Sequence, residues 1–282
     1  MKKLLLALAI FAMVFSASAQ IKTPAPSPFS KLEQKVGLTD VSIEYSRPGV
    51  KDRVIFGDVV PFGKLWRTGA NARTKITFST DVTIADKPLK AGTYAILSVP
   101  GKESWDIIFY TEYDAGGAPA ELDESKVALT VTGKVYPVPF NVESFTIDLN
   151  SLRNSSATLE FIWEKTYVSV PLGVPTDAAV EKSIEAVMAG PSANDYQLAA
   201  QYYLNEGKDI SKAKEWIDKA VEKTGDKTPF WFLRRKALIY AKAGDKKGAI
   251  EAAKLSLEGA KKAGNADYVK MNEASLKEWG AK

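Results

Sequence analysis

The sequence predicts an α+β protein in which an antiparallel β-sandwich precedes an α-helical region. Two periodicities support this prediction. Up to about residue 173, apolar residues recur at every second position, as Val41, Ile43 and Tyr45 do between polar neighbours, which is typical of strands with one buried face. Beyond Pro175, apolar residues recur every three to four positions, which is typical of amphipathic helices. We therefore expect two separate cores in one chain.

The chain opens with the pattern of a signal peptide over residues 1–19. Two lysines precede an apolar run from Leu4 to Phe15, and the small-residue sequence Ala17-Ser18-Ala19 follows it. This run is shorter than the about 20 residues that a membrane-spanning helix needs, and no second run approaches that length. We expect cleavage after Ala19 and an exported mature chain, periplasmic or on the cell surface, without a transmembrane segment.

A proline-rich linker over residues 20–31 is expected to lead into a β-sandwich domain at residues 32–175. The expected strands, in chain order, are 41–46, 75–79, 93–99, 105–110, 127–132, 144–149, 158–163 and 167–172. Gly, Pro, Asn and Asp residues separate them, which is typical of hairpin turns. Many short strands at close spacing favour an antiparallel sandwich or barrel.

Residues 176–282 are expected to form the helical region. Thr176 can cap a first helix that Gly190 and Pro191 end. Further helices are expected at 193–206, 210–223, 229–243, 246–262 and 266–279. Two of them align at a separation of 36 residues, with Ala213 matching Ala249, and a period of about 34 is typical of tetratricopeptide-like repeats. Because so short an array cannot form a long superhelix, we expect it to pack on the β domain or on a protein partner.

The composition excludes several classes of site. The chain has no Cys and no His, which excludes disulfides, zinc sites built from imidazole or thiolate, Cys nucleophiles and Ser-His-Asp triads. Its 38 basic and 34 acidic residues are nearly balanced, which argues against a nucleic-acid partner. The acidic stretch at 110–125 matches no calcium-binding loop and is expected to be a solvated loop tip. We expect no metal, no cofactor and no catalytic residue that can be named.

One stretch, VPFGKLWRTGANARTKITF at residues 60–78, is a candidate site. Four arginines fall between residues 47 and 73, and Arg offers a planar fork of donors for carboxylate, phosphate or sulfate. Glycines in the stretch allow close backbone approach to a ligand. The candidate ligand-binding residues are Tyr45, Arg47, Arg53, Trp66, Arg67 and Asn71. The alternative is architectural, with Trp66 in the core and with Arg67 and Asn71 hydrogen-bonded to backbone carbonyls.

The same stretch belongs to a series of spaced motifs. They are Tyr45-Ser46-Arg47-Pro48-Gly49, Phe56-Gly57, Val60-Pro61-Phe62-Gly63, Trp66-Arg67-Thr68-Gly69-Ala70-Asn71, AGTYAILSVPG at 91–101, Phe145-Thr146-Ile147 and Trp163-Glu164. In this order they resemble DUF2911, a bacterial domain of unknown function, over about residues 30–173. The resemblance implies an exported bacterial protein, often from Bacteroidota, and it implies no activity and no catalytic residues.

Three functions remain open from the sequence. The leading expectation is a non-enzymatic envelope protein whose β domain binds a small molecule, a glycan or a protein, while its helices dock a partner. The second is a hydrolase or isomerase acting on a glycan or small organic anion, with Arg67 working beside a carboxylate such as Asp58. The third is a purely structural envelope protein.

Overall fold

The computed structural model of the chain describes residues 23–188 and 190–281. The predicted signal peptide, residues 1–19, lies outside these ranges. The chain divides into two compact units with the boundary between Thr176 and Asp177, and each unit is described by itself. None of the described helices combines the length and the apolar character needed to cross a membrane.

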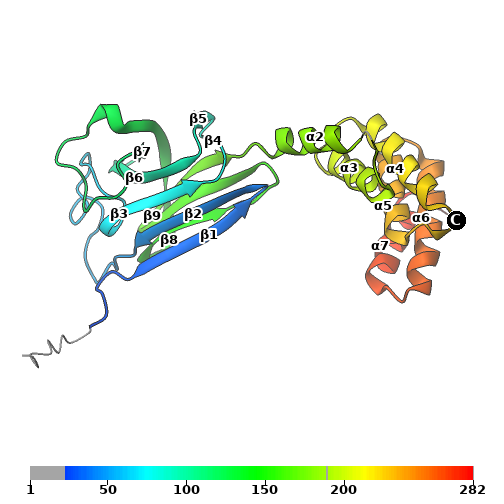
Figure 1. The fold of residues 1–282 in the computed structure, drawn as a ribbon. Helices are drawn as coiled ribbons and strands as arrows, with labels where there is room; N and C mark the ends of the chain where they lie inside the picture. The colour runs from blue at the N-terminus through cyan, green and yellow to red at the C-terminus, as the bar shows by residue number, and fades with distance from the viewer. Residues whose placement is uncertain (1–22, 189, 282) are drawn as a thin grey trace, which may run out of the picture. The chain divides into compact units, whose positions relative to one another are not determined.

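The first unit is built on a sheet of nine strands, which runs in the order β1-β2-β3-β6-β7-β8-β9-β4-β5 (Figure 1). The strands are β1 (Phe29–Val36), β2 (Thr39–Ser46), β3 (Ala70–Phe78), β4 (Val82–Ile84), β5 (Lys87–Leu89), β6 (Gly92–Pro100), β7 (Ser104–Tyr110), β8 (Val127–Asn150) and β9 (Ser156–Gly173). Every neighbouring pair is antiparallel. With the helices that follow, this confirms the predicted α+β class.

The sheet is one continuous sheet that folds over itself. All nine strands contribute buried side chains to a single hydrophobic cluster, which one flat layer could not enclose. The clearest contact across the layers joins β2 to β8, which are not neighbours in the strand order. The Tyr45 hydroxyl donates to the carbonyl of Ile147 (3.1 Å) and accepts from its N–H (3.0 Å). The inner faces of the two layers therefore form the core of this unit.

Two long strands differ from the expected pattern of short ones. β8 includes both 127–132 and 144–149, and β9 includes both 158–163 and 167–172, so four expected strands are two. The pairing of β8 with β9 shifts register between Pro137 and Thr146, as β-bulges do when they bend a strand. In addition, β1 begins at Phe29, inside the expected linker, and the short strands β4 and β5 were not expected.

A second, smaller cluster lies on the outer face of β6 and β7. It contains Ala95, Leu97, Ile108 and Tyr110, with Leu65, Val99, Tyr113, Leu122 and Val127 packed against it. Tyr113 and Leu122 come from the acidic stretch that follows β7. This stretch ends in the 3₁₀ turn η1 (Glu124–Lys126). The stretch therefore covers apolar surface with these two side chains, while its acidic side chains are exposed, as expected of a solvated loop.

The second unit consists of helices α2 (Thr176–Val187), α3 (Ala193–Asn205), α4 (Ile210–Thr224), α5 (Phe230–Lys242), α6 (Lys246–Lys262) and α7 (Ala266–Glu278), with the short turn η2 (Gly225–Lys227). These bounds follow the expected helices closely, because side-chain caps mark several starts. Asp209 caps α4 and Asp245 caps α6, each accepting from backbone N–H groups of the first turn. These caps are also 36 positions apart.

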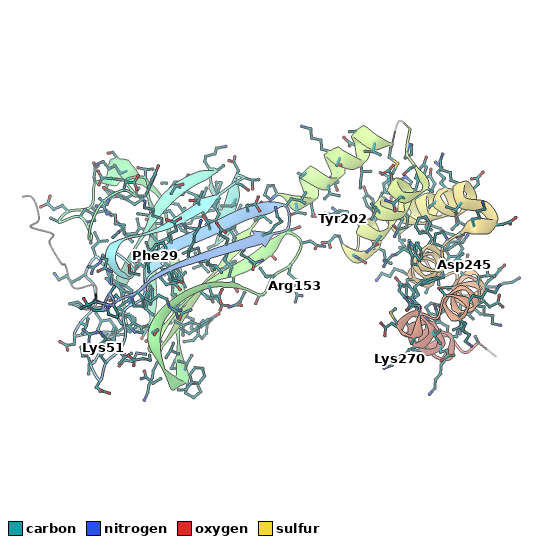
Figure 2. All side chains as sticks on the ribbon, turned by 60° about the horizontal axis from the view of Figure 1, so that its bottom comes forward. Phe29, Lys51, Arg153, Tyr202, Asp245 and Lys270 are labelled. Carbon is teal, nitrogen blue, oxygen red and sulfur yellow. The ribbon has the colours of Figure 1, made fainter. Side chains whose placement is uncertain are left out.

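Small buried residues let the helices of this unit pack closely. Ala213 of α4 and Ala249 of α6 are fully buried at equivalent positions of the two aligned helices. Tyrosines add hydrogen bonds between helices: Tyr240 donates to Asp218 (2.7 Å), and Tyr202, labelled in Figure 2, donates to Asp177. Burial and these carboxylates raise the pKa of both phenols, which therefore remain protonated donors well above neutral pH.

Residues 20–176 expressed alone are expected to fold cooperatively, because all nine strands and their shared core lie within them. Thr176 is kept because its hydroxyl accepts from the N–H of Leu38 (3.4 Å). Circular dichroism and a urea melt would check this, with residues 177–282 as the helical counterpart. A gradual transition without a baseline would mean that the helices complete the β core.

Candidate functional site

Trp66 lies in the middle of the candidate stretch and packs in the core. Its backbone pairs with Ser98 through N–H to carbonyl bonds of 2.8 and 2.9 Å, which extends the sheet locally. Its ring contacts those of Phe56, Trp105, Phe145 and Trp163, with centroids 5.1–6.3 Å apart. The indole N–H donates to the carbonyl of Gly69 (3.2 Å). The structure thus places Trp66 among core aromatics, as in the architectural alternative.

Tyr45 is also a core residue. Only 4% of its surface is exposed, and its hydroxyl is occupied by both backbone groups of Ile147. Its ring meets Phe145 edge-on, with centroids 6.0 Å apart. Tyr45 therefore joins the two layers of the sheet.

Three of the four arginines donate to groups of the protein itself. Arg47 donates to the carbonyl of Phe145 (2.9 Å) and the hydroxyl of Thr146 (2.6 Å). The exposed Arg53 donates to the carbonyls of Val50 (3.0 Å) and Gly49 (2.7 Å). The buried Arg73 donates to the carbonyls of Gly117 (2.9 Å) and Glu112 (2.5 Å). Asn71 likewise donates from its side chain to the carbonyl of Ser27 (3.2 Å). These four side chains hold loops in place.

Arg67 differs from the other three. Its Nε is buried without a hydrogen-bond partner, and its guanidinium makes no hydrogen bond or ion pair with any described residue. Its direction follows from the extended backbone, since successive side chains point to opposite faces. Trp66 faces the core and Leu65 packs in the outer-face cluster, so Arg67 projects toward the outer face. A half-buried cation without an acceptor remains there.

The residue after Arg67 holds a strained backbone conformation. Thr68 is fully buried with a φ of 56°, in the left-handed region that β-branched residues rarely adopt. Two contacts hold it: its hydroxyl lies 2.9 Å from that of Ser98, and its carbonyl accepts from the hydroxyl of Thr74 (2.5 Å). Gly69 follows with a φ of 144°, where a Cβ would lie 3.1 Å from the carbonyl oxygen of Ser46. This corner fixes the backbone that carries Arg67.

The acidic stretch is anchored by Arg73 and Lys126. Glu112 accepts from Arg73 (3.0 Å) and Lys126 (2.9 Å), and these hydrogen bonds lower the pKa of the Glu112 carboxyl, with Lys126 the larger cause. Lys75 pairs with Asp114 in the same stretch. The described ranges contain no group of three or more acidic residues arranged to hold a metal ion.

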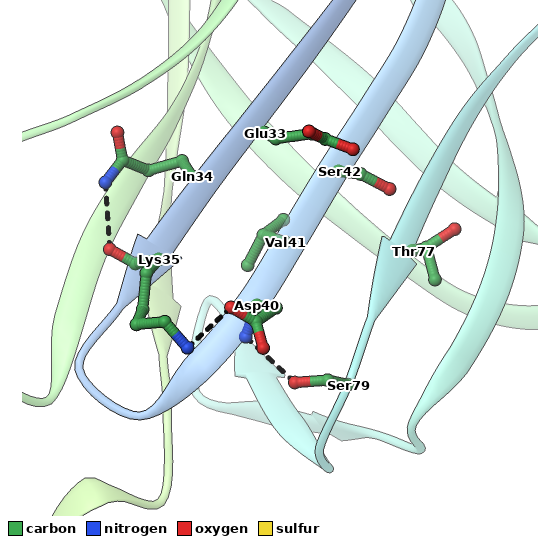
Figure 3. A pocket seen from close by; sticks show the side chains of 8 residues that line it. All are labelled: Glu33, Gln34, Lys35, Asp40, Val41, Ser42, Thr77 and Ser79. Carbon is green, nitrogen blue, oxygen red and sulfur yellow. Dashed lines mark hydrogen bonds and ion pairs between the residues drawn. The ribbon is translucent and has the colours of Figure 1, made fainter.

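Two adjoining hollows lie on the outer face of β1, β2 and β3. The larger, of about 460 Å³, is lined by Glu33, Gln34, Lys35, Asp40, Val41, Ser42, Thr77 and Ser79 (Figure 3). The smaller, of about 230 Å³, is lined by Ser42, Glu44, Lys75, Thr77, Thr93, Tyr113 and Asp114. None of the six predicted site residues lines either hollow. The lysine in each hollow already forms an ion pair. Lys35 pairs with Asp40 (2.6 Å) in the larger hollow, and Lys75 pairs with Asp114 in the smaller one.

Residues 27–172 match the sequence profile of a family described as a protein of unknown function, DUF2911, which is about half of the chain. The chain belongs to the DUF2911 family. Searches of the curated proteins and of the solved structures found no similar protein. The DUF2911 domain thus coincides with the β-structured unit, and the match does not extend over the helices.

The enzyme alternative places a carboxylate beside Arg67 in the DUF2911 domain. Asp58 is exposed in the turn that begins at Ile55, and Arg67 forms no ion pair with Asp58 or with any other described carboxylate. Thr68, whose left-handed backbone lies directly beside Arg67, was not among the predicted site residues. The order Arg-Thr-Gly could have suggested it, because a glycine after a polar residue often marks an irregular turn.

Proposed function

We propose that the protein is an exported binding protein whose DUF2911 domain holds an anionic ligand through Arg67. One observation carries this proposal: of the four arginines between residues 47 and 73, only Arg67 has no acceptor among the described residues. Half-buried cations are normally paired, and the guanidinium fork suits carboxylate, phosphate and sulfate. The ligand class is therefore a small organic or inorganic anion.

The strain at Thr68 supports the same assignment. A non-glycine residue in the left-handed region costs about 1–3 kcal/mol and persists where surrounding contacts enforce it, often at ligand sites. Here those contacts come from Ser98 and Thr74, directly beside Arg67. A corner that costs stability next to an unpaired cation is better explained by recognition than by architecture.

The helical unit contributes a second part of the proposed function. Its paired helices repeat at 36 residues, with equivalent caps and buried alanines, and we assign them as tetratricopeptide-like hairpins that dock a partner. The signal-peptide pattern at residues 1–19 supports an extracytoplasmic site of action, periplasmic or on the cell surface.

Replacing Arg67 with Met is expected to abolish anion binding without loss of stability. Met removes an unpaired buried N–H of Arg67 and leaves no acceptor unsatisfied, so the free energy of unfolding should stay the same or rise by about 1 kcal/mol. Thermal shifts in sulfate, phosphate, succinate and citrate would measure binding, because a ligand of the folded state raises Tm with concentration.

Arg53→Met is the matched control, since Arg53 lies in the same segment and is exposed. Its concentration-dependent Tm shift should equal that of the unmodified protein, while the shift of Arg67→Met should vanish. Equal shifts in both variants, or a destabilised Arg67→Met protein in urea, would show that Arg67 is architectural.

A further inference from the structure

Helix α5 carries two adjacent arginines that are half-buried without a carboxylate partner. Arg234 donates to the hydroxyl of Ser275 (3.0 Å) and the side-chain oxygen of Asn272 (3.4 Å), both neutral groups of α7. The Nε of Arg235 is buried with no partner, and Arg235 makes no hydrogen bond or ion pair within the described chain. Neither guanidinium therefore forms an ion pair with a described carboxylate, although the negative charge of Glu278 acts on Arg234.

The other half-buried cations of this unit are neutralised. Lys208 pairs with Glu181 (2.9 Å), Lys214 with Asp245 (3.1 Å) and Lys236 with Asp218 (2.8 Å). Lys236 directly follows the two arginines in the sequence and reaches its carboxylate on the neighbouring helix α4. The absence of a partner is thus particular to the two arginines and is not a property of the whole unit.

Two adjacent positive charges without an ion-pair partner repel each other. Burial lowers the pKa of both guanidinium groups, and the charge of Arg235 lowers the pKa of Arg234 further. Both groups nevertheless stay charged at neutral pH, because an arginine in a protein does not lose its proton. An anion that supplies acceptors at hydrogen-bond distance would offset this desolvation cost and the repulsion between the two charges. The two adjacent forks can together hold two carboxylates.

An exposed aromatic residue lies on the same helix face. Trp231 is three and four positions before the two arginines, so the three side chains project from one side of α5. Trp231 is 46% exposed, and its ring rests edge-on against that of Phe230, with centroids 5.0 Å apart. Phe230 in turn packs on Tyr268 of α7 (5.0 Å between centroids), which fixes this end of the face.

We propose that Trp231, Arg234 and Arg235, the arginine face of α5, bind an acidic peptide segment. Asp or Glu side chains of the peptide accept from the two guanidinium groups, and a neighbouring apolar side chain covers Trp231. A peptide fits this face better than a free phosphate does. A small ion would pair with the guanidinium groups but would leave the aromatic surface of Trp231 exposed, whereas a peptide can also cover that surface. The proposal goes beyond the anion site at Arg67, which lies in the other unit.

Fluorescence anisotropy on the mature full-length chain would test this. The probe is a fluorescein-labelled, amidated peptide with Leu-Glu-Glu-Leu between Gly-Ser flanks, and its matched control carries Gln in place of Glu. The Glu peptide should bind about tenfold more tightly than the Gln peptide, as expected for hydrogen bonds to charged groups. Arg235→Gln should remove that difference, and Arg235→Lys should reduce it by keeping charge without the fork.

Lys242→Gln is the control variant, because Lys242 is an exposed cation in the last turn of the same helix. It should leave the affinity within about twofold. Arg67→Met should also leave it unchanged, so that failure at one site is distinguished from failure at the other. Three results would overturn the proposal. They are equal affinity for the Glu and Gln peptides, unchanged binding by a folded Arg235→Gln protein, and displacement of the probe by inorganic phosphate at a concentration equal to that of the peptide.

Discussion

Trp66→Ala is expected to lower the free energy of unfolding of the β-structured unit by about 3–5 kcal/mol. The Trp66 ring packs against four other core aromatics, and its truncation would leave a cavity between the two layers of the sheet. It would also leave the carbonyl of Gly69 without its donor, directly beside the strained corner. Urea denaturation followed by circular dichroism would measure the effect.

Phe140→Ala is the matched control for this substitution. Phe140 is an aromatic residue of the same unit, but it lies 62% exposed on β8. Its removal should change the free energy of unfolding by no more than about 0.5 kcal/mol. An unchanged denaturation midpoint for Trp66→Ala would mean that the ring is free to stack on a ligand.

Arg73→Met is expected to cost about 2–4 kcal/mol, the second largest effect. The Arg73 side chain is only 4% exposed, and its loss would leave the carbonyls of Gly117 and Glu112 unpaired beneath the acidic stretch. Cleavage by a protease within residues 111–126 should accelerate, since the stretch would detach from the outer face of β6 and β7. Arg67→Met, by contrast, should not lower the free energy of unfolding, although Arg67 is only six positions from Arg73.

The same anchor predicts a pH dependence. Hydrogen bonds from Lys126 and Arg73 lower the pKa of Glu112, so the folded protein holds this proton less tightly than the unfolded chain does. The contribution of Glu112 to stability is therefore present above the pKa of an unfolded Glu, about 4.3, and is lost as the pH falls through the lowered folded value. Glu112→Gln should reduce the fall in the free energy of unfolding at acid pH. An unchanged fall would contradict a stabilising contact of Glu112 with Lys126 and Arg73.

Local signals explain what could be predicted from the sequence. The helices were located to within a few residues because their caps and stops, such as Asp209, Asp245 and Gly190-Pro191, act through neighbouring backbone groups. The strands were less well predicted. Pro137 and Pro139 interrupt the alternation in β8 and suggested a break, whereas the structure passes them in a bulged, continuous strand.

Contacts between residues far apart in the sequence also decide which of the predicted site residues belong to the core. Whether Tyr45 contacts a ligand or the core depends on Ile147, which is 102 positions away, and no local pattern contains that information. The four arginines are likewise equivalent in the sequence. Only the folded backbone decides that Arg73 meets carbonyls of the acidic stretch, while Arg67 projects where no described residue offers an acceptor.

The contact between Tyr45 and Ile147 also determines the order in which the β-structured unit can be assembled. The hairpin of β1 with β2 and that of β6 with β7 involve short sequence separations, so their chain-closure entropy is small. The two layers can lock together only after β8 has joined the sheet, because Ile147 is 102 positions away from Tyr45. High contact order therefore makes core closure the slow step of folding in this unit, while the helical unit, rich in local contacts, has no such delay.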